Sequence, residues 1–74
     1  MKLFSRFNGD GEDALVILHG LLGSSANWRS LAKRFGQHRA VYSLDLRNHG
    51  QSPWSETMNY GVMADDVLEF IDHL

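Results

Sequence analysis

The sequence lacks cysteine, carries little net charge and has no long apolar run, and each absence excludes a class of protein. Without cysteine, neither disulfides nor a thiolate metal site can stabilise a chain of only 74 residues. The four histidines, at positions 19, 38, 49 and 73, do not have metal-ligand spacing. We expect neither a metal nor an organic cofactor. The net charge of −2 offers no basic surface for nucleic acid, and the apolar runs are too short to cross a membrane.

What is present is the composition of an ordinary globular protein. Hydrophobic residues make up 43% of the chain and charged residues 22%, which argues against intrinsic disorder. The first eight residues alternate between apolar and polar, unlike a signal peptide. We therefore expect one small soluble domain in a reducing compartment, with the cytoplasm favoured.

Local patterns predict an α/β fold with about three strands. Residues 3–7 precede the turn pairs Asn-Gly and Asp-Gly at positions 8–11, which suits a short N-terminal strand, for instance one arm of a hairpin. The apolar run at residues 14–18 does not alternate, so it suits a parallel strand covered on both faces. Residues 40–45 predict a second core strand parallel to it, and such a pair needs a helix between its members.

Two helices are predicted, one after each core strand, so that both faces of the sheet are covered. The first begins at a cap provided by Ser24 or Ser25 and ends at Gly36 in a left-handed conformation. Its apolar stripe consists of Trp28, Leu31, Ala32 and Phe35. The second begins after Asn59, with an apolar stripe of Met63, Val67, Phe70, Ile71 and Leu74. The acidic residues of the second helix are expected on its opposite side, namely Asp65, Asp66, Glu69 and Asp72.

The first loop, H-G-L-L-G-S-S at residues 19–25, has the features of an anion-binding turn. Gly20 and Gly23 let the backbone approach a ligand or adopt a positive φ, and the helix that begins near Ser25 points its free N–H groups at the same place. Such a place favours the negative charge that develops on a carbonyl oxygen during acyl transfer. A tight turn without a ligand is the alternative, whereas the glycine spacing does not match a phosphate-binding loop.

The second loop, D-L-R-N-H-G-Q-S at residues 45–52, follows a strand at the edge where ligands bind in open α/β sheets. Asp45, Arg47 and His49 could form a site there. The favoured interpretation is structural, with Asp45 and Arg47 paired with each other or with nearby backbone and His49 ordering the loop.

Residues for nucleophilic catalysis are not evident. No serine lies in a G-x-S-x-G sequence, so the chain has no recognisable nucleophile elbow, and it has no thiol. His19 is expected to hydrogen-bond the backbone of its own loop, and His38 and His73 are expected at the solvated surface.

Three motifs, taken in order, resemble the N-terminal part of the α/β-hydrolase superfamily. They are H-G-x-x-G at residues 19–23, D-x-R-x-x-G-x-S at residues 45–52 and Y-x-x-x-A-x-D-V at residues 60–67. The R-N-H-G form of the second motif is similar to that of small bacterial and mitochondrial-type esterases that act on acyl esters and thioesters. The resemblance covers essentially all 74 residues but only the first part of the family's catalytic domain.

The resemblance implies roles for individual residues. The backbone N–H of Leu21 would be one of two oxyanion donors, and Leu22 and Asn48 would contact the substrate. Structural roles in the motifs would fall to His19, Gly20, Gly23, Asp45, Arg47 and Gly50. The second donor and the family's serine, acid and catalytic histidine would belong to segments outside these residues. We therefore expect residues 1–74 to be an incomplete α/β-hydrolase domain, inactive alone, with the remainder of the domain as its partner.

The predicted parent is a serine carboxylesterase or thioesterase that acts on a small-molecule ester or thioester. Alternatives within the fold are an epoxide hydrolase, a dehalogenase and a carbon–carbon bond hydrolase. From another class, the chain could be a short non-catalytic protein that pairs through an open sheet edge. In the family's strand order the strand at residues 14–18 has such an edge, which predicts a tendency to aggregate.

Overall fold

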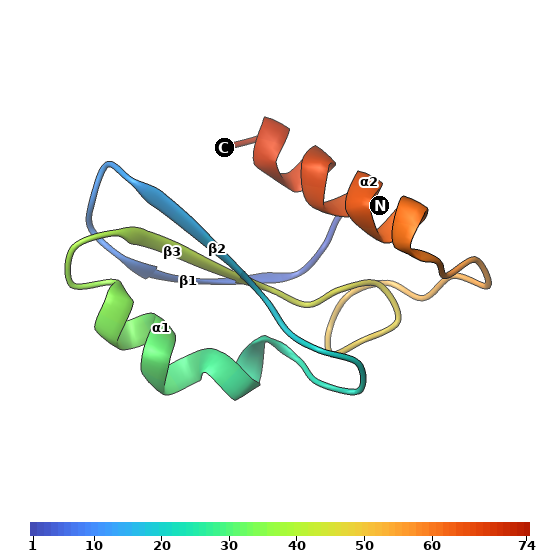
Figure 1. Ribbon diagram of the computed structural model, residues 1–74, viewed down its shortest axis with the longest axis horizontal. Coiled ribbons are helices and arrows are strands. Elements are labelled where there is room, and N and C mark those ends of the chain that lie inside the picture. Colours follow the sequence, from blue (N-terminus) through green and yellow to red (C-terminus); the bar gives the residue numbers. More distant parts are fainter.

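A computed structural model describes all residues, 1–74, and contains three strands, two α-helices and one 3₁₀ turn (Figure 1). The strands are β1 (Ser5–Gly9), β2 (Ala14–Leu18) and β3 (Ala40–Leu44). The 3₁₀ turn η1 covers Ser25–Trp28, and the helices are α1 (Arg29–Phe35) and α2 (Tyr60–Asp72). The predicted α/β fold of about three strands is confirmed, with β3 ending one residue before the predicted boundary of 45.

Strand β3 is the centre of a mixed sheet whose order is β1-β3-β2. Strand β2 runs parallel to β3, with Ala14 beside Ala40 and Leu18 beside Leu44. Helix α1 connects these two strands, so they form the predicted βαβ unit. On the other side, β1 runs antiparallel to β3.

The turn signals suggested that the N-terminal strand is one arm of a hairpin, but β1 does not pair with β2. Residues 10–13 join β1 to β2, but β3 lies between the two strands. Gly9 is the last residue of β1, has a φ of 112° and lies beside the start of β3, where a Cβ atom would lie 1.9 Å from the carbonyl oxygen of Arg39. The Asn-Gly pair therefore marks the end of β1, after which the chain reverses direction. The strand that β1 pairs with lies beyond the reach of local turn signals, since Gly9 is beside Ala40.

The two helices lie on opposite sides of the sheet, α2 above it and α1 below it in Figure 1. The side facing α2 holds the apolar core, in which Leu3, Leu44 and Leu46 are buried. The half-buried residues packed against this core are Met1, Val16, Met63, Val67 and Phe70. Because neighbouring residues of a strand face opposite sides, Val41 points to the α1 side, where Ala32 is also buried.

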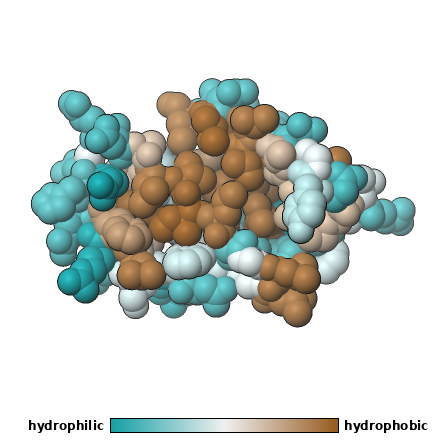
Figure 2. Space-filling view, in the orientation of Figure 1, coloured by the Kyte–Doolittle hydropathy of each residue, from teal (hydrophilic) through white to brown (hydrophobic).

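The apolar strand β2 is less buried than its sequence predicts. It was expected to be covered on both faces, but residues 15–17 are only half-buried and the side chain of Leu18 is 45% exposed. Strand β2 stands at the edge of the sheet, so one of its sides has no neighbouring strand. Figure 2 shows apolar residues gathered across the middle of the face on which β2 lies in front.

Both helical segments begin at a side-chain cap, and of the two caps predicted for the first, Ser24 and Ser25, the structure uses Ser24. The Ser24 hydroxyl accepts a hydrogen bond from the Ala26 amide at the start of η1, and the Asn59 side chain accepts one from the Val62 amide at the start of α2. The end of α1 differs from the prediction. Gly36 caps that helix with a φ of −67°, which is right-handed. The left-handed conformation expected there is therefore wrong.

The apolar stripes of the two helices are only partly covered. On α1, Ala32 alone is buried. On α2, Ile71 is 43% exposed, whereas Asp66, expected on the polar side, is the one buried residue. The predicted division of α2 into an apolar and an acidic side is thus wrong at Asp66. Neither helix has the length and apolar character needed to cross a membrane.

Candidate functional site

In the loop that follows β2, the backbone amides of residues 22–25 are bonded inside the fold, whereas those of Gly20 and Leu21 are not. Four N–H groups have partners: Gly23 donates to the Gly20 carbonyl (3.0 Å), Leu22 to His49 Nε2 (3.1 Å), Ser24 to Asn27 Oδ1 (2.8 Å) and Ser25 to Asp45 Oδ1 (2.6 Å). The Leu21 amide donates to no atom of the chain. Leu21 is 79% exposed, so its amide is open to solvent and is the one donor among residues 21–25 that is free for a ligand.

The backbone of this loop is shaped by Leu22 and Gly23 rather than by both glycines. Leu22 has a φ of 65°, a left-handed conformation that leucine seldom adopts, whereas neither Gly20 nor Gly23 has a positive φ. A Cβ atom at Gly23 would lie 2.7 Å from Asn27 Oδ1, so close packing requires glycine there. At Gly20 a Cβ atom would meet nothing within 4 Å. Gly20 therefore borders open space.

Asp45 holds the two loops together from a buried position. Its side chain is 1% exposed and accepts hydrogen bonds from the Ser25 amide (2.6 Å) and the Gln51 amide (2.9 Å). Burial by itself would raise the pKa of Asp45, but these hydrogen bonds outweigh it and hold the pKa below its usual value. Gly50 has a φ of 50° and lies against this carboxylate, where a Cβ atom would be 2.3 Å from Asp45 Oδ2.

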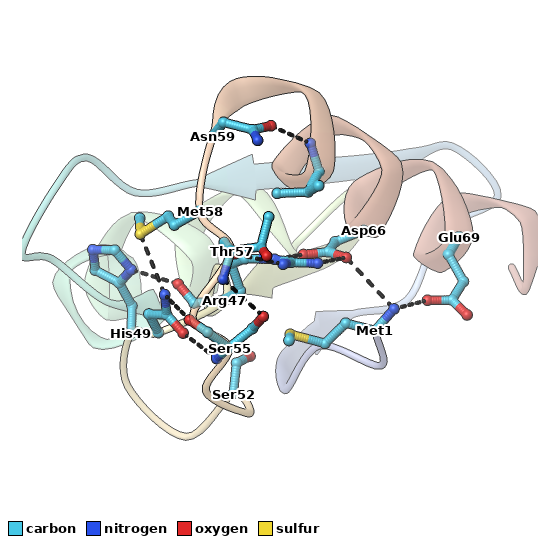
Figure 3. A network of polar contacts seen from close by, with 12 residues as sticks. Met1, Arg47, His49, Ser52, Ser55, Thr57, Met58, Asn59, Asp66 and Glu69 are labelled. Carbon is cyan, nitrogen blue, oxygen red and sulfur yellow. Dashed lines mark hydrogen bonds and ion pairs between the residues drawn. The ribbon is translucent and has the colours of Figure 1, made fainter.

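Arg47 does not pair with Asp45, as one predicted alternative had it, but with Asp66 of α2 (Figure 3). The pair is bidentate, with Nε to Oδ2 at 2.7 Å and Nη2 to Oδ1 at 2.9 Å, and Nη1 donates to the Thr57 carbonyl at 2.7 Å. The hydrogen bond from Arg47 lowers the pKa of Asp66 despite burial, and the same bond raises the pKa of Arg47. This pair attaches α2 to the second loop.

The two histidines of the loops are buried and fully hydrogen-bonded. His19 Nε2 accepts from the Leu46 amide (3.0 Å) and its Nδ1 contacts the Gly20 carbonyl (2.7 Å). His49 Nε2 accepts from the Leu22 amide (3.1 Å) and its Nδ1 contacts the Arg47 carbonyl (2.8 Å). The ring centroids are 4.9 Å apart. Both rings therefore bond loop backbone, as the sequence analysis predicts.

An open cleft of about 710 Å³ lies between the two loops and the start of α2. Its apolar lining comes from Leu21, Leu46, Met58, Tyr60 and Met63. Gly20 and the two histidines also border it. The unpaired Leu21 amide thus belongs to a residue that lines a largely apolar hollow, which is the usual character of a small-molecule site.

The structure keeps Leu22 and Asn48, the two predicted substrate contacts, out of the cleft lining. The Leu22 side chain is 90% exposed. The Asn48 side chain donates to the Ser55 carbonyl (3.0 Å) and accepts from the Ser55 amide (2.7 Å). Contact with a substrate therefore stays a prediction for both residues.

Asp66 was predicted only to lie on the polar side of its helix, but it is the buried partner of Arg47. A signal for it exists in the sequence. Asp66 lies three residues after Met63 and four before Phe70, so it falls inside the apolar stripe of the helix. A lone acidic residue in such a stripe indicates a buried partner of opposite charge, since an unpaired buried charge is costly.

Comparison with known proteins gives matches over most of the chain. Residues 13–74 match the model of the family described as alpha/beta hydrolase fold. Among solved structures, a marine microorganism esterase superposes with a TM-score of 0.94 at 46% identity, covering 97% of this chain and 28% of that one.

Two curated relatives extend the comparison. An sn-1-specific diacylglycerol lipase of Danio rerio is 42% identical over 71 residues, which are 92% of this chain and 22% of the lipase. An ethanol acetyltransferase of Cyberlindnera jadinii is 39% identical over 71 residues, which are 93% of this chain and 21% of that enzyme. The chain spans about a fifth of the length of the curated relatives it matches.

Proposed function

The chain belongs to the α/β-hydrolase fold family, and from this premise we propose that it forms the oxyanion-binding part of an ester-hydrolysing domain. In this role the Leu21 N–H donates a hydrogen bond to the carbonyl oxygen of the substrate as that oxygen becomes negative. The single observation that carries the proposal is the unpaired Leu21 amide at the wall of an apolar cleft.

The position of this amide suits the chemistry. A donor stabilises the tetrahedral intermediate best when it is fixed before the reaction, because no reorganisation is then needed as the charge develops. The neighbouring amides of Leu22 and Gly23 are bonded inside the fold, so the loop around Leu21 is held in place. Ser25 and Asp45 tie the end of the same loop to β3.

The proposed substrate is a small ester or thioester with an apolar acyl or alcohol portion. The cleft has leucine and methionine side chains in its wall and no carboxylate or basic residue other than the two bonded histidines. Such a lining gives an apolar group a favourable environment and offers nothing to pair with a charged one. The marine esterase and the lipase of Danio rerio are relatives whose names agree with this class.

The proposed reaction also requires a nucleophile and a base that these residues do not provide. In the family mechanism a serine attacks the carbonyl, a histidine accepts its proton, and the oxyanion is held by two donors. None of the serines here lies in G-x-S-x-G, and both buried histidines already use both ring nitrogens. We therefore propose that residues 1–74 act together with the remainder of a hydrolase domain and do not hydrolyse esters by themselves. The cytoplasmic location stays a prediction of the sequence.

A second candidate is acyl transfer to an alcohol, favoured by the identity with the ethanol acetyltransferase. The same oxyanion donor serves both reactions, because both pass through a tetrahedral intermediate at the acyl carbon. They differ in whether water or an alcohol takes the acyl group. Product analysis with ethanol present separates the two, since transfer yields an ethyl ester and hydrolysis yields the free acid.

The test uses a chimera in which residues 1–74 replace the matching segment of the marine esterase. Leu21→Pro removes the N–H, and Leu21→Ala keeps it while shortening a side chain that borders the cleft but is 79% exposed. We expect Leu21→Pro to lower kcat about 100-fold to 1000-fold, the usual loss for one oxyanion donor, and Leu21→Ala to change it little. Replacing the same amide by an ester linkage removes the N–H without a proline ring and should give the same loss. Equal activity of the Pro and Ala chimeras would overturn the assignment.

A further inference from the structure

The two buried histidines exchange hydrogen bonds between the loops in a reciprocal way. His19, from the loop after β2, accepts a hydrogen bond from the Leu46 amide of the other loop. His49, from the loop after β3, accepts one from the Leu22 amide of the first loop. Each ring contacts, through Nδ1, a carbonyl oxygen of its own loop. The rings pack against each other with centroids 4.9 Å apart.

These contacts fix the protonation of both rings. A backbone amide can only donate, so each Nε2 must accept and carries no proton. A carbonyl oxygen can only accept, so each Nδ1 must carry the proton. Both imidazoles are therefore neutral and in the same tautomer. A proton added at either Nε2 would face a backbone N–H and break the bond between the loops.

The histidines act on the two peptide groups on either side of Leu21. His19 Nδ1 and the Gly23 amide both donate to the Gly20 carbonyl. That carbonyl belongs to the same planar trans peptide as the Leu21 N–H, so holding one end of the peptide sets the direction of the other. On the far side of Leu21, the N–H of the Leu21–Leu22 peptide is held by His49 Nε2.

The bond to His49 is also the only hydrogen bond that joins residues 20–23 to a segment distant in sequence. Packing cannot replace it, because the Leu22 side chain is 90% exposed. Leu22 moreover has the unfavourable φ of 65°, a conformation that needs support from its surroundings.

We propose that His19 and His49 are positioning residues that hold the Leu21 amide in place, and that they do so only while both rings are neutral. The role at the oxyanion rests on the proposed function, but the hydrogen-bond arrangement and its loss in acid do not. Neither histidine touches a reacting atom in this arrangement. They act through the two peptides that flank Leu21.

Few charged groups surround the two rings. None of the ion pairs in the chain involves either histidine, although the Asp45 carboxylate interacts with His19 through its charge. The nearby Asp45 carboxylate is bonded to the Ser25 and Gln51 amides, and the Arg47 guanidinium is bonded to Asp66. From α2, the titratable group that lines the same cleft is the phenol of Tyr60. Two charged rings at this separation would repel each other.

The first test is nuclear magnetic resonance on the isotope-labelled chain of 74 residues. Long-range correlations between ring protons and ring nitrogens distinguish the two tautomers directly. We expect both buried rings to be protonated at Nδ1 alone at neutral pH, and the Leu21 and Leu22 amide signals to shift together as acid protonates the rings. A ring protonated at Nε2, or Leu22 signals that do not follow the ring titration, would overturn the proposal.

Variants at position 49 show whether the loop depends on the hydrogen-bond acceptor of His49 or only on the shape of its ring. His49→Phe keeps a ring but no acceptor, and we expect hydrogen exchange of the Leu22 amide to accelerate about tenfold, as for one lost hydrogen bond. His49→Gln places an oxygen near the position of Nε2 and should restore most of the protection. His38→Phe, at an exposed histidine far from the loops, is the control and should behave as the parent chain. If His49→Phe leaves the exchange of Leu22 unchanged, or His49→Gln gives no rescue, the positioning role is wrong.

The same variants in the marine esterase chimera test the link to catalysis. We expect His49→Phe to lower kcat at least tenfold with a smaller change in KM, and His49→Gln to recover most of the loss. A fall in kcat without rescue by glutamine would contradict positioning. The outcome of Leu21→Pro remains separate: if that chimera keeps its activity, the oxyanion assignment fails, whereas the tautomer and exchange results still decide whether the histidines hold the loop.

Discussion

The two loops that border the cleft are built in opposite ways. In the loop after β2, Leu21 and Leu22 are 79% and 90% exposed. In the loop after β3, Asp45, Arg47 and His49 are buried although they are polar or charged. Every one of these three side chains has hydrogen-bond partners inside the fold. The buried loop is therefore a scaffold, and the exposed loop is the part that the scaffold presents to the cleft.

Each loop also contains one residue other than glycine with a left-handed backbone. Leu22 and Asn48 both have a φ of 65°, one in each loop. Asn48 is suited to that conformation, and its side chain bonds both backbone groups of Ser55. Leu22 has no such side-chain bonds and depends on the hydrogen bond from its amide to His49. The strained residue lies in the exposed loop, and the group that supports it lies in the buried one.

The largest effect should come from breaking the scaffold at Asp66. Asp66→Ala leaves Arg47 without the carboxylate that pairs with it, and we expect a loss of about 3 to 5 kcal/mol in the free energy of unfolding. Asp65→Ala is the matched control, because Asp65 is an exposed neighbour on the same helix. Thermal and urea denaturation measure both variants. Equal stability of the two would mean that the buried pair does not support the loop.

A second pair of substitutions compares the glycines of the two loops. Gly50→Ala forces a Cβ atom onto the Asp45 carboxylate at a φ of 50°, and we expect it to lose about 1 to 3 kcal/mol of stability. Gly20→Ala meets nothing within 4 Å and should change stability by less than about 0.5 kcal/mol. Denaturation curves of the two variants decide the matter. If Gly20→Ala is the more damaging, the assignment of scaffold and presented loop is reversed.

Acid should weaken the scaffold through its two buried carboxylates, Asp45 and Asp66. The pKa values of Asp45 and Asp66 are both below the ordinary 3.8, so the unfolded chain takes up protons at higher pH than the folded chain. Their contribution to stability is complete above that ordinary value and falls as the pH drops through the lowered native values. Unfolding free energies measured from pH 6 to pH 2 check this sign. In Asp45→Asn the free energy of unfolding should fall less between pH 6 and pH 2. If it falls by as much as in the parent chain, Asp45 does not contribute to the pH dependence of stability.

The smallest expected effect is a gain in stability from a substitution in the exposed loop. Leu22→Asn places a residue that tolerates a left-handed backbone at a φ of 65° and removes a side chain that is 90% exposed. We expect the chain to become more stable by about 0.5 to 1 kcal/mol. Asn48→Leu is the reverse substitution in the buried loop and should destabilise, because it also removes the bonds to Ser55. Calorimetry of both variants tests whether the loops differ as described.

The sequence was sufficient where a structural feature depends on neighbouring residues. The apolar run of β2, the strand at β3, the cap at Ser24 or Ser25 and the start of α2 after Asn59 are all set within a few residues, and all were predicted. The three motifs also indicated the fold family to which the chain belongs.

The remaining features depend on contacts between distant residues. A run of apolar residues does not by itself say whether its strand stands at the centre or the edge of a sheet. The open edge of β2, and with it the exposure of Leu18, was expected only from the strand order of the family that the motifs resemble. The partner of Arg47 is 19 residues away. The position of Asp66 in the apolar stripe of its helix indicates a buried pair, but it does not say which basic residue completes that pair. The mutual bonding of His19 and His49 with the opposite loops joins positions 27 residues apart. Only the folded chain brings these groups together.

The position of β3 between β1 and β2 sets the order in which the sheet can assemble during synthesis. The two earlier strands are joined by residues 10–13, yet they flank a gap one strand wide, roughly 10 Å across. Their backbone groups therefore find no ladder partners until the ribosome has released residues 40–44. Until then the nascent chain has two unpaired strands, one of them strongly apolar. At this stage the chain exposes the apolar surface that chaperones bind.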